Sequence, residues 1–153
     1  MIVALLIVHG LLAVALLGAI THQAVSVVRP VPAGPRNFVT RFRAVNGASY
    51  TGAIVVLFIV TSIGGACLYP QYRLDIRTTL EDLNLRGANG IFEIKEHLAA
   101  IGLGLLPAYW FLWRQPADPA CLTARKYVTW ILAFLVWWNF VVGHILNNIK
   151  GFG

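Results

Sequence analysis

Four long apolar runs, separated by short polar connections, constrain this chain more than any other feature of its sequence. They cover about residues 2–28, 49–69, 91–113 and 127–149, and each is close to the roughly 20 residues that a helix needs to cross the hydrocarbon core of a bilayer. Only 12% of the 153 residues are charged, against roughly 25% in soluble domains. We therefore predict a single all-α domain, an integral membrane four-helix bundle without a separate soluble domain.

The connections contain residues that end helices or interrupt them. Three prolines between positions 29 and 35 withhold backbone donors and end the first run. Pro70 is expected to end the second run for the same reason. In the stretch 73–86, leucines are interspersed with charged residues at loosely helical spacing. This pattern is compatible with an amphipathic segment lying on the membrane surface and equally with an ordered loop.

Positive charge is unevenly distributed over the connections. Residues 29–48 hold four arginines and no acidic residue, and the connection after the third run is also basic, whereas residues 72–96 mix both signs. Cytoplasmic connections carry an excess of Lys and Arg. We therefore predict that both termini lie on the non-cytoplasmic side. The net charge of +6 is then explained by membrane orientation, and a nucleic-acid partner is not expected.

All four histidines lie inside or at the ends of the apolar runs, where ionisable side chains are costly and mark candidate functional sites. At a rise of ~1.5 Å per residue, His9, His97 and His144 share one layer, about a third of the way into the bilayer from the non-cytoplasmic side. We expect them to converge. His22 lies roughly 20 Å deeper, where it is either an interfacial hydrogen-bonding residue or a separate functional group.

Three convergent imidazoles fit two kinds of centre. Histidine pairs on facing helices are the usual axial ligands of a membrane b-type haem, and we prefer His97 with His144, with His9 as the third candidate. The small residues of the stretch 64–66 would allow a macrocycle to approach, although such residues also mediate plain helix packing. Imidazole equally suits copper, zinc or non-haem iron. The histidines would otherwise make only interhelical hydrogen bonds.

Other polar residues near this layer are secondary candidates. Glu93 and Glu96 stand beside His97, where carboxylates orient an imidazole, bind a metal or pass protons near a quinone. They are equally typical of a hydrated helix start, where the helix dipole favours acidic residues. Arg73, on the same side of the membrane, is a candidate for binding a haem propionate.

The four spans with facing histidines resemble the small four-helix membrane cytochromes b, including the haem-carrying anchor subunits of formate dehydrogenases and hydrogenases. The resemblance is architectural and covers the whole chain. It implies an electron-transfer subunit, not an independent enzyme, that binds one b-type haem near the non-cytoplasmic face within a larger respiratory complex. The stretches 69–73 and 90–102 also look like segments of small bacterial membrane proteins, which implies the bacterial inner membrane.

Two further functions remain open from the sequence. One is a copper-handling or other metal-binding assembly factor, in which the three histidines and Glu93 or Glu96 hold a single ion. The other is a cofactor-free accessory subunit of a membrane complex. The expected partners are the lipid bilayer, other membrane protein subunits and a quinone.

Overall fold

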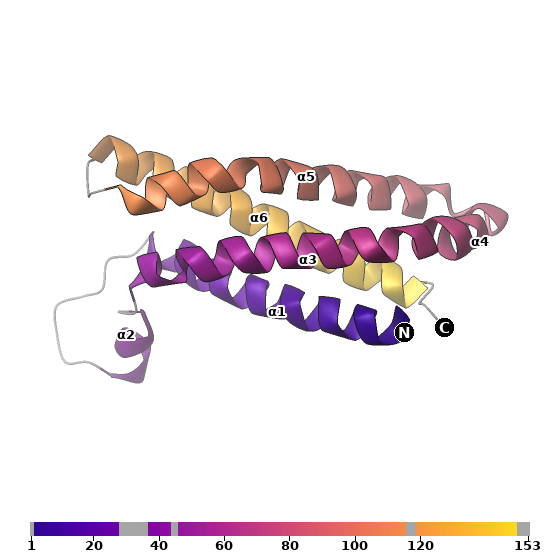
Figure 1. Ribbon diagram of the computed structural model, residues 1–153, viewed down its shortest axis with the longest axis horizontal. Coiled ribbons are helices and arrows are strands. Elements are labelled where there is room, and N and C mark those ends of the chain that lie inside the picture. Colours follow the sequence, from indigo (N-terminus) through magenta and orange to yellow (C-terminus); the bar gives the residue numbers. More distant parts are fainter. Residues whose placement is uncertain (1, 28–36, 44–45, 116–118, 150–153) are drawn as a thin grey trace.

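The computed structural model shows four long helices lying side by side in an elongated bundle (Figure 1). It describes residues 2–27, 37–43, 46–115 and 119–149, apart from the side chains of residues 39, 42 and 43. Within these ranges every regular element is helical and no strand occurs, which confirms the predicted all-α fold. The elements are α1 (Ile2–Ser26), α2 (Phe38–Arg43), η1 (Gly47–Tyr50), α3 (Thr51–Gln71), η2 (Tyr72–Ile76), α4 (Arg77–Asp82), α5 (Arg86–Arg114) and α6 (Pro119–Ile149).

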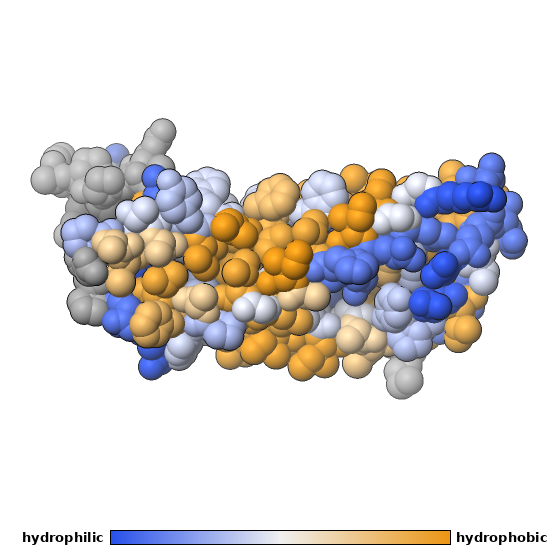
Figure 2. All heavy atoms as spheres, turned by 90° about the horizontal axis from the view of Figure 1, so that it is seen from above, coloured by the Kyte–Doolittle hydropathy of each residue, from blue (hydrophilic) through white to orange (hydrophobic). Residues whose placement is uncertain are grey.

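Three of the long helical stretches are long and apolar enough to cross a membrane, namely Ile2–Ser26, Gly47–Asp82 and Pro119–Ile149. The helix α5 has 29 residues but is less apolar, because its first turns carry several charged side chains. Large apolar side chains elsewhere face outward, such as Leu11 at 67% exposure and Phe134 at 59%. Figure 2 shows hydrophobic residues over the middle of the bundle and hydrophilic ones gathered at one end. These features suggest a lipid environment.

The helices pack as a closed ring with one loose side. The helix α1 packs against α3 and α6, and α5 packs mainly against α6, whereas α3 and α5 form the sparsest pair. The main apolar core lies towards the end that holds the α5–α6 connection, and it includes Ile20, Ile54 and Leu132, all fully buried.

A hydrogen-bonded polar network stabilises the same half of the bundle. The buried Gln23 side chain donates from Nε2 to the carbonyl oxygen of Gly47 at 2.8 Å and accepts a hydrogen bond from the Tyr109 hydroxyl. Trp113 donates from Nε1 to the Thr129 hydroxyl at 3.0 Å. Because buried polar groups are costly unless they are paired, these bonds allow polar side chains in the core, and we interpret this half as structural.

The second apolar run does not end at Pro70, contrary to our prediction. Pro70 lies inside α3, and the chain continues through the π-helix η2 into α4. Helical hydrogen bonding continues directly after the proline, because the Tyr72 N–H reaches the carbonyl oxygens of Leu68 and Tyr69. Most of the stretch 73–86 therefore continues the helix of the second apolar run.

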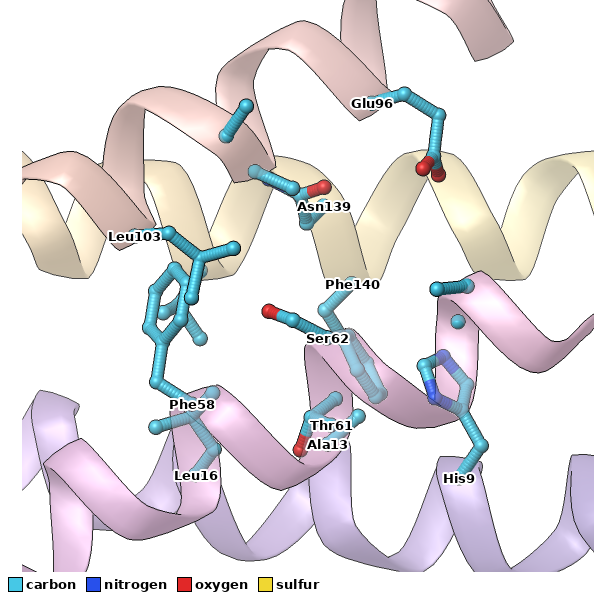
Figure 3. A pocket seen from close by; sticks show the side chains of 15 residues that line it. His9, Ala13, Leu16, Phe58, Thr61, Ser62, Glu96, Leu103, Asn139 and Phe140 are labelled. Atoms are coloured by element: carbon cyan, nitrogen blue, oxygen red, sulfur yellow. The ribbon is translucent and has the colours of Figure 1, made fainter. Parts of the chain in front are cut away.

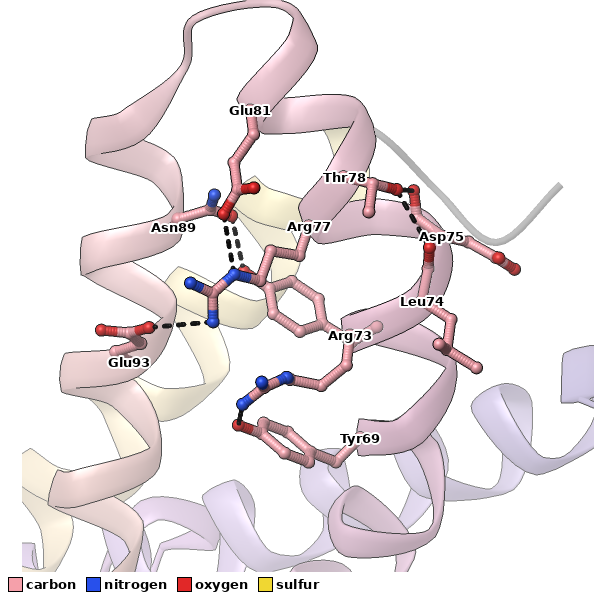
Figure 4. Close-up of polar contacts among 10 residues, drawn as sticks. Tyr69, Arg73, Leu74, Asp75, Arg77, Thr78, Glu81, Asn89 and Glu93 are labelled. Atoms are coloured by element: carbon pink, nitrogen blue, oxygen red, sulfur yellow. Dashed lines mark hydrogen bonds and ion pairs between the residues drawn. The ribbon is translucent and has the colours of Figure 1, made fainter.

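Side-chain contacts hold this extension against the start of α5. The Tyr72 and Phe92 rings are stacked with their centroids 3.5 Å apart. Arg77 forms ion pairs with Glu81 at 2.8 Å on its own helix and with Glu93 of α5 at 3.5 Å (Figure 4). This tertiary support explains why the helix persists beyond its proline.

The two ends of the bundle differ in charge. The helix α1 begins and α6 ends at one end, while α2 and the connection between α5 and α6 lie at the other (Figure 1). The basic residues Arg41, Arg114, Arg125 and Lys126 belong to this second end. The charge asymmetry of the sequence therefore lies along the bundle axis, as the predicted orientation requires. Which end faces the cytoplasm stays a prediction.

Candidate functional site

A cavity of about 250 Å³ lies between all four long helices, in the half of the bundle nearer the two chain ends (Figure 3). Its polar lining consists of His9 from α1, Thr61 and Ser62 from α3, Glu96 from α5 and Asn139 from α6. The remaining lining side chains are apolar, and many are alanines. A mostly apolar wall with a few convergent polar groups is typical of a small-molecule site. We call this cavity the His9 pocket.

His9 is seated against two glycines of α3. A Cβ at Gly64 would lie 3.1 Å from His9 Nδ1, and one at Gly65 would lie 3.5 Å from its Cε1. The glycine wall that the sequence suggested for a macrocycle therefore faces this imidazole. Both His9 Nδ1 and Thr61 Oγ1 are buried without a hydrogen-bond partner in the described part of the chain. These two atoms lie between α1 and α3 beside the cavity, whereas the His9 ring as a whole is among the lining residues.

Glu96 reaches into the pocket from the wall opposite His9 (Figure 3). Its carboxylate pairs with the Lys95 ammonium at 2.9 Å, and the two side chains are only 35% and 15% exposed. Lys95 extends towards α6, since a Cβ at Gly143 would lie 3.4 Å from its Cε. The pair therefore brings a compensated charge into the bundle, where an isolated one would be expensive.

Asn139 adds a further polar group to the pocket. Its side-chain Nδ2 donates to the carbonyl oxygen of Leu135, one turn earlier on α6, at 2.8 Å. This bond fixes the orientation of the amide, so that Oδ1 is the atom that can accept a hydrogen bond from a ligand. Together with the hydroxyl of Ser62, the pocket therefore offers both a donor and an acceptor to a ligand.

The pocket opens sideways between α3 and α5. Its exposed lining residues are Ala66 of α3 and Ala100 and Leu103 of α5, while every lining residue from α1 and α6 is buried or half-buried. This opening coincides with the loosest pair of helices in the ring. In a membrane the entrance would face the lipid, so a lipid-soluble molecule has direct access.

His97 and His144 do not join His9 in the pocket. Both side chains are exposed on the outside of the bundle. His97 Nδ1 lies 2.6 Å from the carbonyl oxygen of Glu93. Since a carbonyl only accepts, Nδ1 carries the proton and Nε2 stays available as a ligand. The His144 ring is parallel to that of Phe140, with centroids 6.4 Å apart.

The other predicted site residues lie outside the pocket, Glu96 excepted. Glu93 is exposed and paired with Arg77. Arg73 is exposed, and its Nη1 donates to the Tyr69 hydroxyl at 3.3 Å. His22 lines a separate groove on α1, and its ring lies 5.1 Å from that of Tyr50. Among the residues that the structure describes, no group of three or more His, Cys, Asp or Glu side chains is placed to hold a metal ion.

Sequence reasoning missed Thr61 and Ser62 as lining residues. The available signal was a pair of hydroxyl side chains in the middle of an otherwise apolar run. The pair is easily overlooked because a Ser or Thr in a membrane helix often hydrogen-bonds only to its own helix. From the sequence, Asn139 was a candidate to hydrogen-bond a haem propionate, a quinone or neighbouring backbone, and its Nδ2 donates to the backbone of Leu135.

Comparison of the chain with models of protein families, with curated proteins and with solved structures found no match. The functional assignment therefore rests on the geometry of the His9 pocket and on the sequence.

Proposed function

We propose that the chain is a membrane subunit of an electron-transfer complex whose redox-active ligand binds in the His9 pocket. The observation that carries the proposal is that His9 and Glu96 line one cavity between the four long helices from opposite walls. An ionisable pair facing a cavity at membrane depth is the usual mark of a functional site. Other subunits would supply the electron donor and acceptor.

The proposal includes the membrane arrangement predicted from the sequence. The helix α5 would be the fourth span, with the chain in the bacterial inner membrane and both termini on the non-cytoplasmic side. The gathering of the basic residues of α2 and of the α5–α6 connection at one end supports this orientation. The His9 pocket then lies in the non-cytoplasmic half of the membrane.

A bis-histidine haem does not fit the His9 pocket. Such a haem needs two imidazoles on facing walls, and His9 is the one histidine among the lining residues. The cavity of about 250 Å³ is also smaller than a haem macrocycle with its propionates. A single redox-active ring of the quinone class suits the volume and the mixture of donors and acceptors better.

The proposal is tested on the purified, intact protein. Oxidised and reduced absorption spectra, elemental analysis and organic extraction together identify any redox-active ligand. We expect a lipid-soluble redox molecule that is retained in His97→Gln and lost in His9→Gln. Recovery of no redox-active ligand from the folded protein, together with failure to bind an added quinone, would overturn the proposal.

A second candidate is a b-type haem on the outer face of the bundle. Its support is the hydrogen bond from His97 Nδ1 to the Glu93 carbonyl, which leaves Nε2 as a free ligand on an exposed face. His144 is exposed on α6, the main packing partner of α5. A haem there would be shared with a neighbouring subunit.

The same samples distinguish this candidate and the metal alternative. A Soret band that disappears in His97→Gln but persists in His9→Gln supports the outer haem. Copper or zinc without porphyrin supports a metal-binding assembly factor. The variant with His9, His97 and His144 all replaced by Gln tests the cofactor-free accessory subunit. That function is supported if the protein carries no ligand and the variant still assembles with its partners.

A further inference from the structure

A long apolar groove runs along the outside of the bundle between α3 and α5. Its volume is about 610 Å³. One side is formed by Val55, Val56 and Ile59, and the other by Leu106, Pro107 and Trp110. It extends from the level of the His9 pocket towards the basic end of the bundle, over roughly 10 Å along α5 at ~1.5 Å per residue.

The groove and the His9 pocket meet at Leu103, which lines both. Leu103 is 38% exposed and lies at the lateral opening of the pocket. On the inner side, the buried ring of Phe58 packs directly against Gly102 and closes the space between the helices. A ligand in the pocket that has a long substituent would therefore extend it outward over Leu103 into the groove.

We propose that the ligand of the His9 pocket is a quinone with an isoprenoid tail, its ring inside the pocket and its tail along the α3–α5 groove. This inference rests on the proposed electron-transfer function and names the ligand of the same site. Quinone carbonyl oxygens only accept hydrogen bonds, and Ser62 in the pocket wall carries a hydroxyl donor. The reduced form carries hydroxyl donors, for which Asn139 Oδ1 is an acceptor.

Charge argues against a phospholipid in the same position. A phosphate headgroup needs cationic partners, but the lining residues include no Lys or Arg, and Lys95, next to the lining residue Glu96, is already paired with it at 2.9 Å. The phosphate would thus meet the Glu96 carboxylate, which lines the pocket itself. A neutral ring avoids this repulsion, whereas an isoprenoid tail is as apolar as the groove.

The location of the tail is the property to measure. A tail gains little free energy on moving from lipid to an apolar protein surface, so the affinity alone is a poor test. The probe is a benzoquinone with a decyl tail that ends in a photoreactive diazirine, added to the full-length protein in lipid nanodiscs. We expect crosslinks on the groove-forming residues of α3 and α5, and competition by the tail-free parent quinone.

Two matched variants separate the groove from the general surface. Val56 and Ile63 are both β-branched residues of α3, 59% and 58% exposed, but only Val56 lines the groove. Val56→Trp fills the groove. We expect it to reduce crosslinking to the groove residues by about tenfold or more, because the added ring would clash with the tail. Ile63→Trp should leave the crosslinks unchanged.

The outcomes separate this inference from the proposed function. Crosslinks on the α1 and α6 side, for instance at Val14 or Val25, with His9-dependent binding of the ring overturn the tail position and leave the function standing. Recovery of a haem as the sole redox ligand overturns both, because a haem does not fit the His9 pocket. If neither the tailed nor the tail-free quinone binds the folded protein, and no other redox ligand is recovered from it, both this inference and the proposed function are overturned.

Discussion

The Phe58 ring of α3 lies so close to Gly102 of α5 that a Cβ at position 102 would overlap it. This contact joins the two helices that otherwise pack most loosely in the ring. It also forms the inner boundary of the His9 pocket, because Phe58 is one of the lining residues. The absence of a side chain at position 102 therefore sets how closely α3 and α5 approach below the pocket.

Gly102→Ala should destabilise the protein by about 1–3 kcal/mol, the usual cost of adding a methyl group to a packed interior. The matched control is Gly104→Ala, on the same helix, where a Cβ would meet no neighbour and alanine is the better helix former. Thermal unfolding in detergent measures both variants. Equal melting temperatures for the two would show that the Phe58 contact does not constrain the helices.

Gly64→Ala should weaken ligand binding more than it lowers stability. Its Cβ would lie 3.1 Å from His9 Nδ1, so the imidazole must shift away from its position in the pocket. Gly10→Ala is the control, because a Cβ there meets nothing. Titration with the tail-free quinone should give about tenfold weaker binding, equivalent to about 1.4 kcal/mol, for Gly64→Ala alone. An equal loss of affinity in both variants would contradict the role of Gly64 in positioning the His9 ring.

Lys95→Met should destabilise the protein because it leaves the Glu96 carboxylate without its partner inside the bundle. Breaking a buried pair costs about 3–5 kcal/mol, and we expect less here, about 1–3 kcal/mol, since Glu96 is 35% exposed. The double variant Lys95→Met/Glu96→Gln should recover most of the loss. Thermal unfolding of both single variants and of the double variant measures the energetic coupling between Lys95 and Glu96. Losses of stability that simply add would show that the two side chains are not coupled.

The native cysteines offer a direct test of membrane orientation. Cys121 lies near the start of α6, at the basic end of the bundle, whereas Asp82 lies at the end of α4, at the opposite end. After Cys67→Ser, a membrane-impermeant maleimide should label Cys121 only when the cells are permeabilised. In a Cys67→Ser/Cys121→Ser background, Asp82→Cys should be labelled in intact spheroplasts. The reverse pattern would place both termini in the cytoplasm.

The helical architecture was predictable because it depends on local properties of the sequence. Length and hydropathy of an apolar run determine whether a segment forms a long apolar helix. The continuation beyond Pro70 was not predictable in this way. It depends on the stacking of Tyr72 on Phe92 and on the Arg77–Glu93 ion pair, which join residues that are distant in the sequence.

The sequence predicted the level of the candidate site along the helices, but not the direction in which its side chains point. Counting residues places His9, Glu96 and His97 at one level, but neighbouring residues on a helix point ~100° apart. Glu96 consequently faces the pocket while His97 faces outward. The rotation of α5 about its axis is set by packing, through residues such as Gly102, Leu106 and Tyr109 that are buried against the other helices.

The continuous helix Gly47–Asp82 would also determine how deep the protein sits in a membrane. Its 36 residues correspond to roughly 54 Å at 1.5 Å per residue, well beyond a hydrocarbon core of about 30 Å. Sinking by a single turn would draw the ion pair of Arg77 with Glu93 into hydrocarbon, and rising would expose the apolar middle of the bundle to water. In a bilayer, the helix and its ion pair would limit movement of the bundle along the membrane normal and would keep the lateral entrance of the pocket at a constant level among the lipid chains.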